Sequence, residues 1–190
     1  ATAGGIVSGG RLGTSVVGTE VRVANMPAPL LYVSPTQINA QVPYEVPVGT
    51  QAVTITTPGG TSTAQNLAVG AVSPAIFVVV KNSDWSLVTA ANPARAGDAL
   101  VIFCTGLGAA NPAVPSGQLP PVTPLSRPTA TPTVTIGGVG ATVLDSVLAP
   151  GFAGVQQVNV LVPPGAPTGS QPVRLTIGGV QSNAANVVIQ

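Results

Sequence analysis

The chain contains no histidine, and it has only one cysteine, five acidic residues and six basic residues in 190 positions. Without histidine it has no ordinary catalytic triad, no imidazole metal ligand and no side chain whose unperturbed pKa lies near neutrality. The single Cys104 cannot form a disulfide within the chain. The acidic residues are scattered singly, without the spacing of a calcium loop. We therefore expect no enzyme activity, no catalytic residue, no cofactor and no metal site.

Charged and aromatic residues are also scarce. Charged residues make up 6% of the chain, whereas a soluble domain usually carries about a quarter. The formal net charge is +1, and neither the basic nor the aromatic side chains form a cluster, which argues against nucleic acid as a partner. The most apolar stretch, residues 68–80, is too short to span a membrane. A chain with so little charge is poorly protected against association with its own copies.

Glycine, proline and apolar residues are abundant instead. The chain has 23 Gly and 20 Pro, and 45% of its residues are hydrophobic. This combination is too apolar for disorder and too rich in turn residues for a helical protein. Ile38, Ala40 and Val42 alternate with polar residues, and this period of two predicts β-strands. We expect an all-β fold of short antiparallel strands separated by turns.

An internal repeat organises these strands. Residues 37–69, the first copy, align without a gap to residues 157–189, the second copy, with thirteen identities over 33 positions at a constant offset of 120. Each copy predicts a meander with one apolar face, which another sheet must cover. We therefore predict two tandem Ig-like antiparallel β-sandwich domains that arose by internal duplication, one over residues 11–90 and the other over residues 91–190.

The two copies differ in what precedes them. Residues 99–104 are continuously apolar and predict a buried strand that completes the second sandwich. The first copy is preceded only by the glycine-rich residues 1–10, so we predict that its sandwich lacks one strand. An unpaired edge beside an apolar cleft is a site for strand addition. We predict that residues 1–10 form an N-terminal extension that leaves its own domain and serves as a donor strand to a neighbouring copy, through Ala3, Ile6 and Val7.

Other features have structural and functional interpretations. The sequence Gln-x-Asn recurs at 37–39 and 157–159, and its place on the same strand of both copies favours a structural role. The glycines at 106 and 108 are typical of a strand-ending turn, because no phosphate-loop lysine follows them. Tyr32 and Trp85 are candidate interface aromatics, and they are also candidates for stacking on a sugar.

Four stretches carry a resemblance to a known family: PAPLLYVSPTQINAQVPYEV at 27–46, ANPARAG at 91–97, FCTGLG at 103–108 and LAPGF at 148–152. Over roughly residues 16–190 the chain resembles the Solibacter-type C-terminal domain family of secreted acidobacterial proteins. The resemblance implies Ig-like modules and an extracellular setting, and it implies no established activity. Members of the family usually have a further strand, ending in a Phe-Gly-type motif, ahead of the first copy, and this chain departs from that pattern.

Together these observations predict a non-enzymatic structural protein that assembles with its own copies. We expect an extracellular filament or surface layer whose subunits are joined by inter-subunit strand addition, that is, by donor-strand complementation. The alternative is a C-terminal module of a larger secreted protein that binds a surface polysaccharide or another protein. The chain begins at Ala1 without an initiator methionine, as we expect of a secreted product whose signal has been removed.

Overall fold

The computed structural model describes residues 2–5 and 7–190, which form strands, turns and loops but no helix, and therefore no helix that could span a membrane. The predicted all-β, Ig-like fold class is confirmed. The chain divides into two compact units. The first unit comprises Ala1–Ala71, Pro112–Pro124 and Pro150–Gly154, and the second comprises Val72–Asn111, Leu125–Ala149 and Val155–Gln190.

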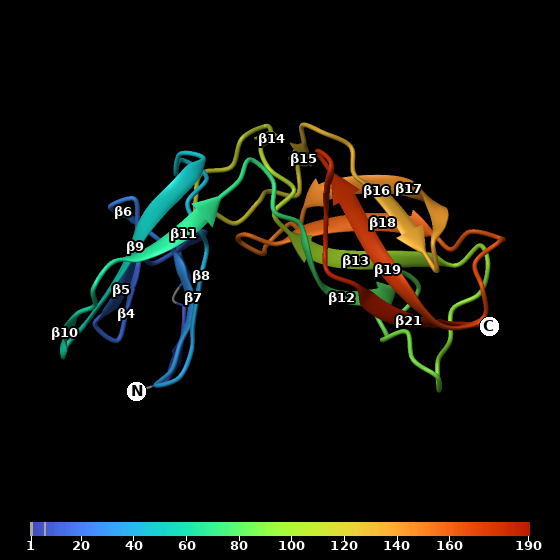
Figure 1. Cartoon of the computed structure of the whole chain (residues 1–190), viewed down its shortest axis with the longest axis horizontal. Helices are drawn as coiled ribbons and strands as arrows, with labels where there is room; N and C mark the ends of the chain where they lie inside the picture. The colour runs from blue at the N-terminus through green and yellow to red at the C-terminus, as the bar shows by residue number, and fades with distance from the viewer. Residues whose placement is uncertain (1, 6) are drawn as a thin grey trace. The chain divides into compact units, whose positions relative to one another are not determined.

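The first unit is a sandwich of two short sheets (Figure 1), and its second and third strands form a separate two-stranded sheet. Its strands are β1 (Ala3–Gly4), β2 (Val7–Ser8), β3 (Arg11–Leu12), β4 (Ser15–Val16), β5 (Thr19–Val23), β6 (Met26–Pro27), β7 (Leu30–Val33), β8 (Ile38–Ala40), β9 (Gly49–Thr57), β10 (Gly60–Thr61) and β11 (Gln65–Val69). One sheet has the order β1-β7-β8, and the other has the order β10-β9-β5-β4, with β6 paired to β5 and β11 paired to β9. Leu30 and Val33 of the first sheet pack against Val16 and Val21 of the second.

The second unit contains one long sheet that folds into two layers (Figure 1). Its strands are β12 (Ala75–Lys81), β13 (Ala99–Thr105), β14 (Ala110–Asn111), β15 (Arg127–Pro128), β16 (Thr133–Ile136), β17 (Val139–Leu148), β18 (Gln156–Leu161), β19 (Gly169–Ile177), β20 (Val180–Gln181) and β21 (Ala185–Ile189). The order is β12-β13-β18-β17-β16-β19-β20, with β21 paired to β19. The first residues of β17 pair with β16 and the remaining residues pair with β18, so β17 connects the two layers.

The strand predicted to complete the second sandwich is β13. It lies between β12 and β18, and Leu100, Val101 and Ile102 are fully buried, as the continuous apolar run predicts. Gly106 and Gly108 follow it with φ values of 78° and 83°, which favour glycine and fit the predicted strand-ending turn.

The internal duplication is visible in the strands and in their pairing. Strands β9, β10 and β11 recur as β19, β20 and β21 exactly 120 positions later. Val21 of β5 pairs with Ile55 of β9, and Val134 of β16 pairs in the same way with Leu175 of β19. The two copies therefore fold into the same arrangement of strands.

The division between the units differs from the predicted boundary at residues 90–91. The main segment of the first unit ends at Ala71, and β12 belongs to the second unit because it pairs along its length with β13. Residues 112–124 fold back onto the first unit, where the Gly117 N–H donates to Gln41 Oε1 at 2.8 Å and the Gly117 carbonyl accepts from the Leu12 N–H at 2.8 Å. The alternation of apolar and polar residues predicts that a segment is a strand, but it does not predict which distant segment will contact it.

Candidate functional site

The outer edge of β8, on the side away from β7, distinguishes the first copy from the second. Among residues 2–5 and 7–190, β8 pairs with β7 alone. Its counterpart β18 pairs with β17 on one side and with β13 on the other. In the described part of the first unit, no strand occupies the position that β13 occupies in the second. We call this side of β8 the open edge.

The open edge presents the main-chain groups of Ile38 and Ala40. Two hydrogen bonds of 2.8 Å lie on the β7 side. The Gln37 carbonyl accepts from the N–H of the first residue after β7, and the Gln41 N–H donates to the carbonyl of the residue before β7. Consecutive residues of a strand direct their main-chain groups to opposite edges. Ile38 and Ala40 therefore direct their N–H and carbonyl groups to the open edge, where an added strand could pair with them.

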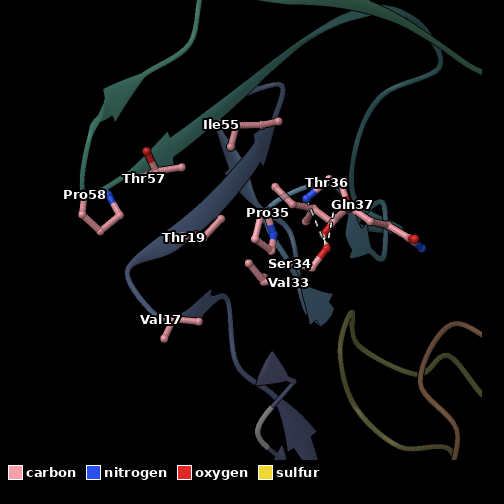
Figure 2. Close-up of a pocket in the computed structure, with 11 residues that line it drawn as sticks. Val17, Thr19, Val33, Ser34, Pro35, Thr36, Gln37, Ile55, Thr57 and Pro58 are labelled. Atoms are coloured by element: carbon pink, nitrogen blue, oxygen red, sulfur yellow. Dashed lines mark hydrogen bonds between the residues drawn. The ribbon is translucent and has the colours of Figure 1, made fainter. Parts of the chain in front are cut away.

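A cavity of about 670 Å³ lies between the two sheets of the first unit, beside β8 (Figure 2). Ile55 and Thr57 of β9 line one wall, and Val33 of β7 and Ile38 of β8 line the opposite wall. In the turn before β8, the Ser34 hydroxyl accepts hydrogen bonds from the N–H groups of the two residues that directly precede β8, at 3.3 and 3.0 Å. The lining is mainly apolar, with threonines on the walls and polar residues in the turn before β8.

The apolar positions around β8 and β9 are exposed in the first copy and buried in the second. Val42 is 41% exposed, whereas Val162, its counterpart, is 1% exposed. Ile55 is partly exposed, whereas Leu175 is fully buried in a cluster with the inward side chains of β12 and β13. The first copy thus has the apolar face of an Ig-like sandwich without the strands that cover this face in the second copy.

The recurrent Gln-x-Asn makes the same contact in both copies. Gln37 Nε2 donates to Asn39 Oδ1 at 2.7 Å, and Gln157 Nε2 donates to Asn159 Oδ1 at 2.9 Å. The two side chains of each motif therefore bond to each other along one strand. The identical contact in both copies favours the structural interpretation of this motif.

The N-terminal segment, predicted to serve as a donor strand, lies against its own unit. Ala3 pairs with Val33 of β7, and Val7 pairs with Leu12 of β3. Ile6 lies outside the described residues. This arrangement differs from the prediction that residues 1–10 leave their own domain.

One glycine of this segment, Gly5, explains its position. The Gly5 N–H donates to the Leu31 carbonyl at 2.8 Å, and a Cβ atom at Gly5 would lie 2.0 Å from the carbonyl oxygen of Leu30. Only glycine permits so close an approach to a backbone. The absence of a side chain at Gly5 thus allows the segment to pair with β7 of its own chain.

The two aromatic residues predicted at an interface belong to different units. Tyr32 lies in β7 and is partly exposed. Trp85 follows the turn after β12, is 58% exposed and stacks on Phe103 of β13, with ring centroids 6.1 Å apart. Phe77, on β12, is exposed as well. A role of Tyr32 or Trp85 at an interface stays a prediction.

Two side chains of potential reactivity, those of Cys104 and Glu45, are buried or hydrogen-bonded. Burial raises the pKa of the Cys104 thiol to about 12, so the nucleophilic thiolate is scarce at neutral pH. A hydrogen bond from the Ser116 hydroxyl to Glu45 Oε2, at 2.6 Å, lowers the pKa of that carboxyl. In the part of the chain that the structure describes, no three His, Cys, Asp or Glu side chains come close enough to hold a metal ion.

Sequence reasoning placed the missing strand in the first domain but did not identify the residues of the open edge or the cavity. A difference between the copies marks these residues. Thr57, which is exposed and lines the cavity, stands where the second copy has Ile177. A polar residue at a position that the other copy keeps apolar indicates contact with solvent.

Comparison with known proteins supports the Ig-like architecture. Residues 6–69 match the family model of the IPT/TIG domain, which is an Ig-like domain, and the match covers about a third of the chain. No curated protein matches the chain. Domains of this kind are typically non-catalytic and fit a structural or adhesion module. The Solibacter-type resemblance is a finer assignment that stays a prediction.

Proposed function

We propose that the chain is an extracellular structural protein whose copies assemble by β-strand addition at the open edge of β8. The observation that carries this proposal is the unpaired edge beside an uncovered apolar cavity, at the position where β13 closes the second copy. Pairing at such an edge supplies main-chain hydrogen bonds, and the cavity receives alternate side chains.

The composition of the open edge supports association. Proteins usually protect an exposed edge strand with charged residues, proline or a bulge that turns the edge away from partners. Residues 36–41 carry no charge and no proline. The chain as a whole has 6% charged residues, so electrostatic repulsion between copies is weak.

The extracellular setting rests on the Solibacter-type resemblance. The filament or surface layer rests on the geometry of strand addition. A strand of one copy inserted into the edge of the next is a heterologous contact, and such contacts propagate unless the rotation between copies closes a ring. Assembly of this kind needs no reactive group, in agreement with the buried thiol and the hydrogen-bonded carboxylates.

Substitution of Ala40 by proline tests the proposal, because proline removes the N–H that faces the open edge and leaves the β7 side unaltered. The matched control is Ala64→Pro, since Ala64 is exposed, belongs to the same unit and lies outside the strands. We expect the wild-type chain and Ala64→Pro to assemble with increasing concentration in analytical ultracentrifugation and electron microscopy, and Ala40→Pro to remain monomeric. A monodisperse wild-type chain, or assembly of Ala40→Pro equal to the wild type, would contradict the proposal.

A second candidate function is carbohydrate or protein binding as an adhesion module. It is favoured by the exposed Trp85, which stacks on Phe103. Phe77 and Leu87 of the same unit are exposed as well. Aromatic faces of this kind stack on sugars. A saturable change of Trp85 fluorescence on titration with polysaccharides, lost in Trp85→Ala, would support this function. An unchanged fluorescence across a glycan panel would oppose it.

A further inference from the structure

We infer that the partner of the open edge is an extended polypeptide strand with the residue pattern of β13, running antiparallel to β8 in a register that the second copy specifies. This inference rests on the proposed function, because it names the chemistry of the strand that the same edge accepts. The partner is a segment of about seven residues with apolar side chains at alternate positions, and β13 itself has this length.

The second unit supplies the register. In the pairing of β13 with β18, Leu100 lies opposite Val160 and Ile102 lies opposite Val158. Subtracting 120 from the β18 positions places the corresponding residues of an added strand opposite Ala40 and Ile38.

The orientation of the main chain agrees with this register. The Val162 carbonyl accepts from the Gly97 N–H, and the Val162 N–H donates to the Asp98 carbonyl, at 2.9 Å each. Even-numbered residues of this part of the second copy therefore direct their main-chain groups toward the β13 side. The same alternation in the first copy directs Ile38 and Ala40 to the open edge, so both copies offer the same hydrogen-bonding pattern to a strand.

The cavity explains why alternate residues of the partner must be apolar. Leu100, Ile102 and Cys104 are the inward residues of β13, and they pack in one cluster with Leu175. Ile55 is the counterpart of Leu175 and lines the cavity of the first unit. A strand in the inferred register would direct its own alternate side chains toward this wall and bury the face that is now exposed.

Two segments of another copy are candidates for the partner strand, and both are already paired in their own units. Residues 99–105 of another copy are already the buried β13 of that copy, between β12 and β18. Residues 1–10 contain four glycines, and their described part pairs with β7 and β3 of their own unit. A copy can therefore donate such a strand only if the strand first leaves its own sheet, whereas a free peptide of the same pattern binds without this step.

A synthetic peptide of residues 99–105, with Cys104→Ser and two added lysines for solubility, tests the inference on the full chain. We expect saturable binding that slows amide hydrogen exchange at Ile38 and Ala40. A spin label at the peptide's first residue should broaden the resonances of Gln41 rather than those of Thr36, since the strands are antiparallel. Replacing the peptide's two central inward residues, Leu100 and Ile102, by serine should weaken binding by about a hundredfold or more, because their burial is lost.

The chain variants separate this inference from the assembly proposal. Ala40→Pro should weaken peptide binding by about tenfold, because one main-chain hydrogen bond and its geometry are lost, whereas Ala64→Pro should bind as the wild type does. Peptide binding without self-assembly would refute assembly among copies and keep the strand partner. Failure of the peptide to bind would overturn the inference even if the chain assembles. Equal binding of the peptide with serine at positions 100 and 102 would overturn it as well. Persistence of the hydrogen bond between Gln41 and the residue before β7 in Ala40→Pro, seen as a slowly exchanging amide, shows that this variant is folded.

Discussion

The first and second copies of the repeat share their strands and pairing but differ in what covers them. In the second copy, β13 pairs with β18, and β12, β13 and β18 cover the apolar face of β19 and β21. In the first copy, β8 has no such neighbour among the described residues, so the corresponding face of β9 and β11 lacks an equivalent cover and a mainly apolar cavity remains. The repeated sequence therefore specifies a meander, and the completeness of the sandwich depends on segments outside the repeat.

The first copy also shows how a sequence tolerates such an uncovered face. It has Ala40 and Thr57 where the second copy has Val160 and Ile177. These residues are smaller or more polar, so exposing them to water costs less free energy than exposing Val or Ile. Ile38 and Ile55 keep their apolar character, as an edge that receives a strand requires.

The largest expected effect comes from truncating one core position in each copy. Leu175→Ala should destabilise the second unit by about 2–5 kcal/mol, since Leu175 is fully buried. Ile55→Ala, at the equivalent position of the first unit, should cost about 1 kcal/mol, because Ile55 already contacts an open cavity. Urea unfolding followed by hydrogen exchange of peptides from β9 and β19 measures the two effects separately. Equal losses of stability in the two variants would indicate that the apolar face of the first unit is covered as fully as that of the second.

An intermediate effect is expected at the N-terminal segment, which has no aligned partner in the second copy. Gly5→Ala places a Cβ against the Leu30 carbonyl and should detach β1 from β7, at no more than about 2 kcal/mol because the segment can open locally. Gly4→Ala is the matched control, since a Cβ there meets nothing within 4 Å. Limited proteolysis of residues 1–5 should accelerate in the first variant only. Equal protection of both variants would mean that β1 does not depend on the close approach at Gly5.

The smallest effect concerns Glu45, which the second copy replaces by Gly165. The hydrogen bond from Ser116 lowers the pKa of Glu45 in the folded chain, so its stabilising contribution is present above the pKa of the unfolded chain and is lost as the pH falls through the lower folded-state value. Ser116→Ala should therefore weaken the acid dependence of the first unit's stability below about pH 5 and leave the second unit unchanged. Thermal unfolding of the wild-type chain and of Ser116→Ala across this pH range measures the difference in the pH dependence of their stability. An identical pH dependence would assign no role to this hydrogen bond.

Much of the fold could be predicted from the sequence because the determining signals are local or repeated. The alternation at Ile38, Ala40 and Val42 predicted strands, and the offset of 120 predicted the correspondence of β9 with β19. The apolar run at 99–104 predicted the buried β13. The missing strand of the first sandwich was predicted from the same comparison.

Contacts between distant segments could not be predicted in the same way. The assignment of β12 to the second unit depends on its pairing with β13, and the return of residues 112–124 to the first unit depends on Gln41 and Leu12. The position of β1 depends on the absence of a side chain at Gly5. A glycine in the sequence is compatible with a close approach to many backbones, so it does not indicate which strand lies beside it. The open edge became identifiable only when the pairing of β8 could be compared with that of β18.

Amide hydrogen exchange of the dilute, monomeric chain tests the central claim most directly, because it measures the protection of each strand edge. The account predicts that the amide hydrogens of Ile38 and Ala40 exchange at least about a hundredfold faster than those of Val158 and Val160, which face β13. Equal protection at these four positions would show that a strand already covers β8 and would contradict the account.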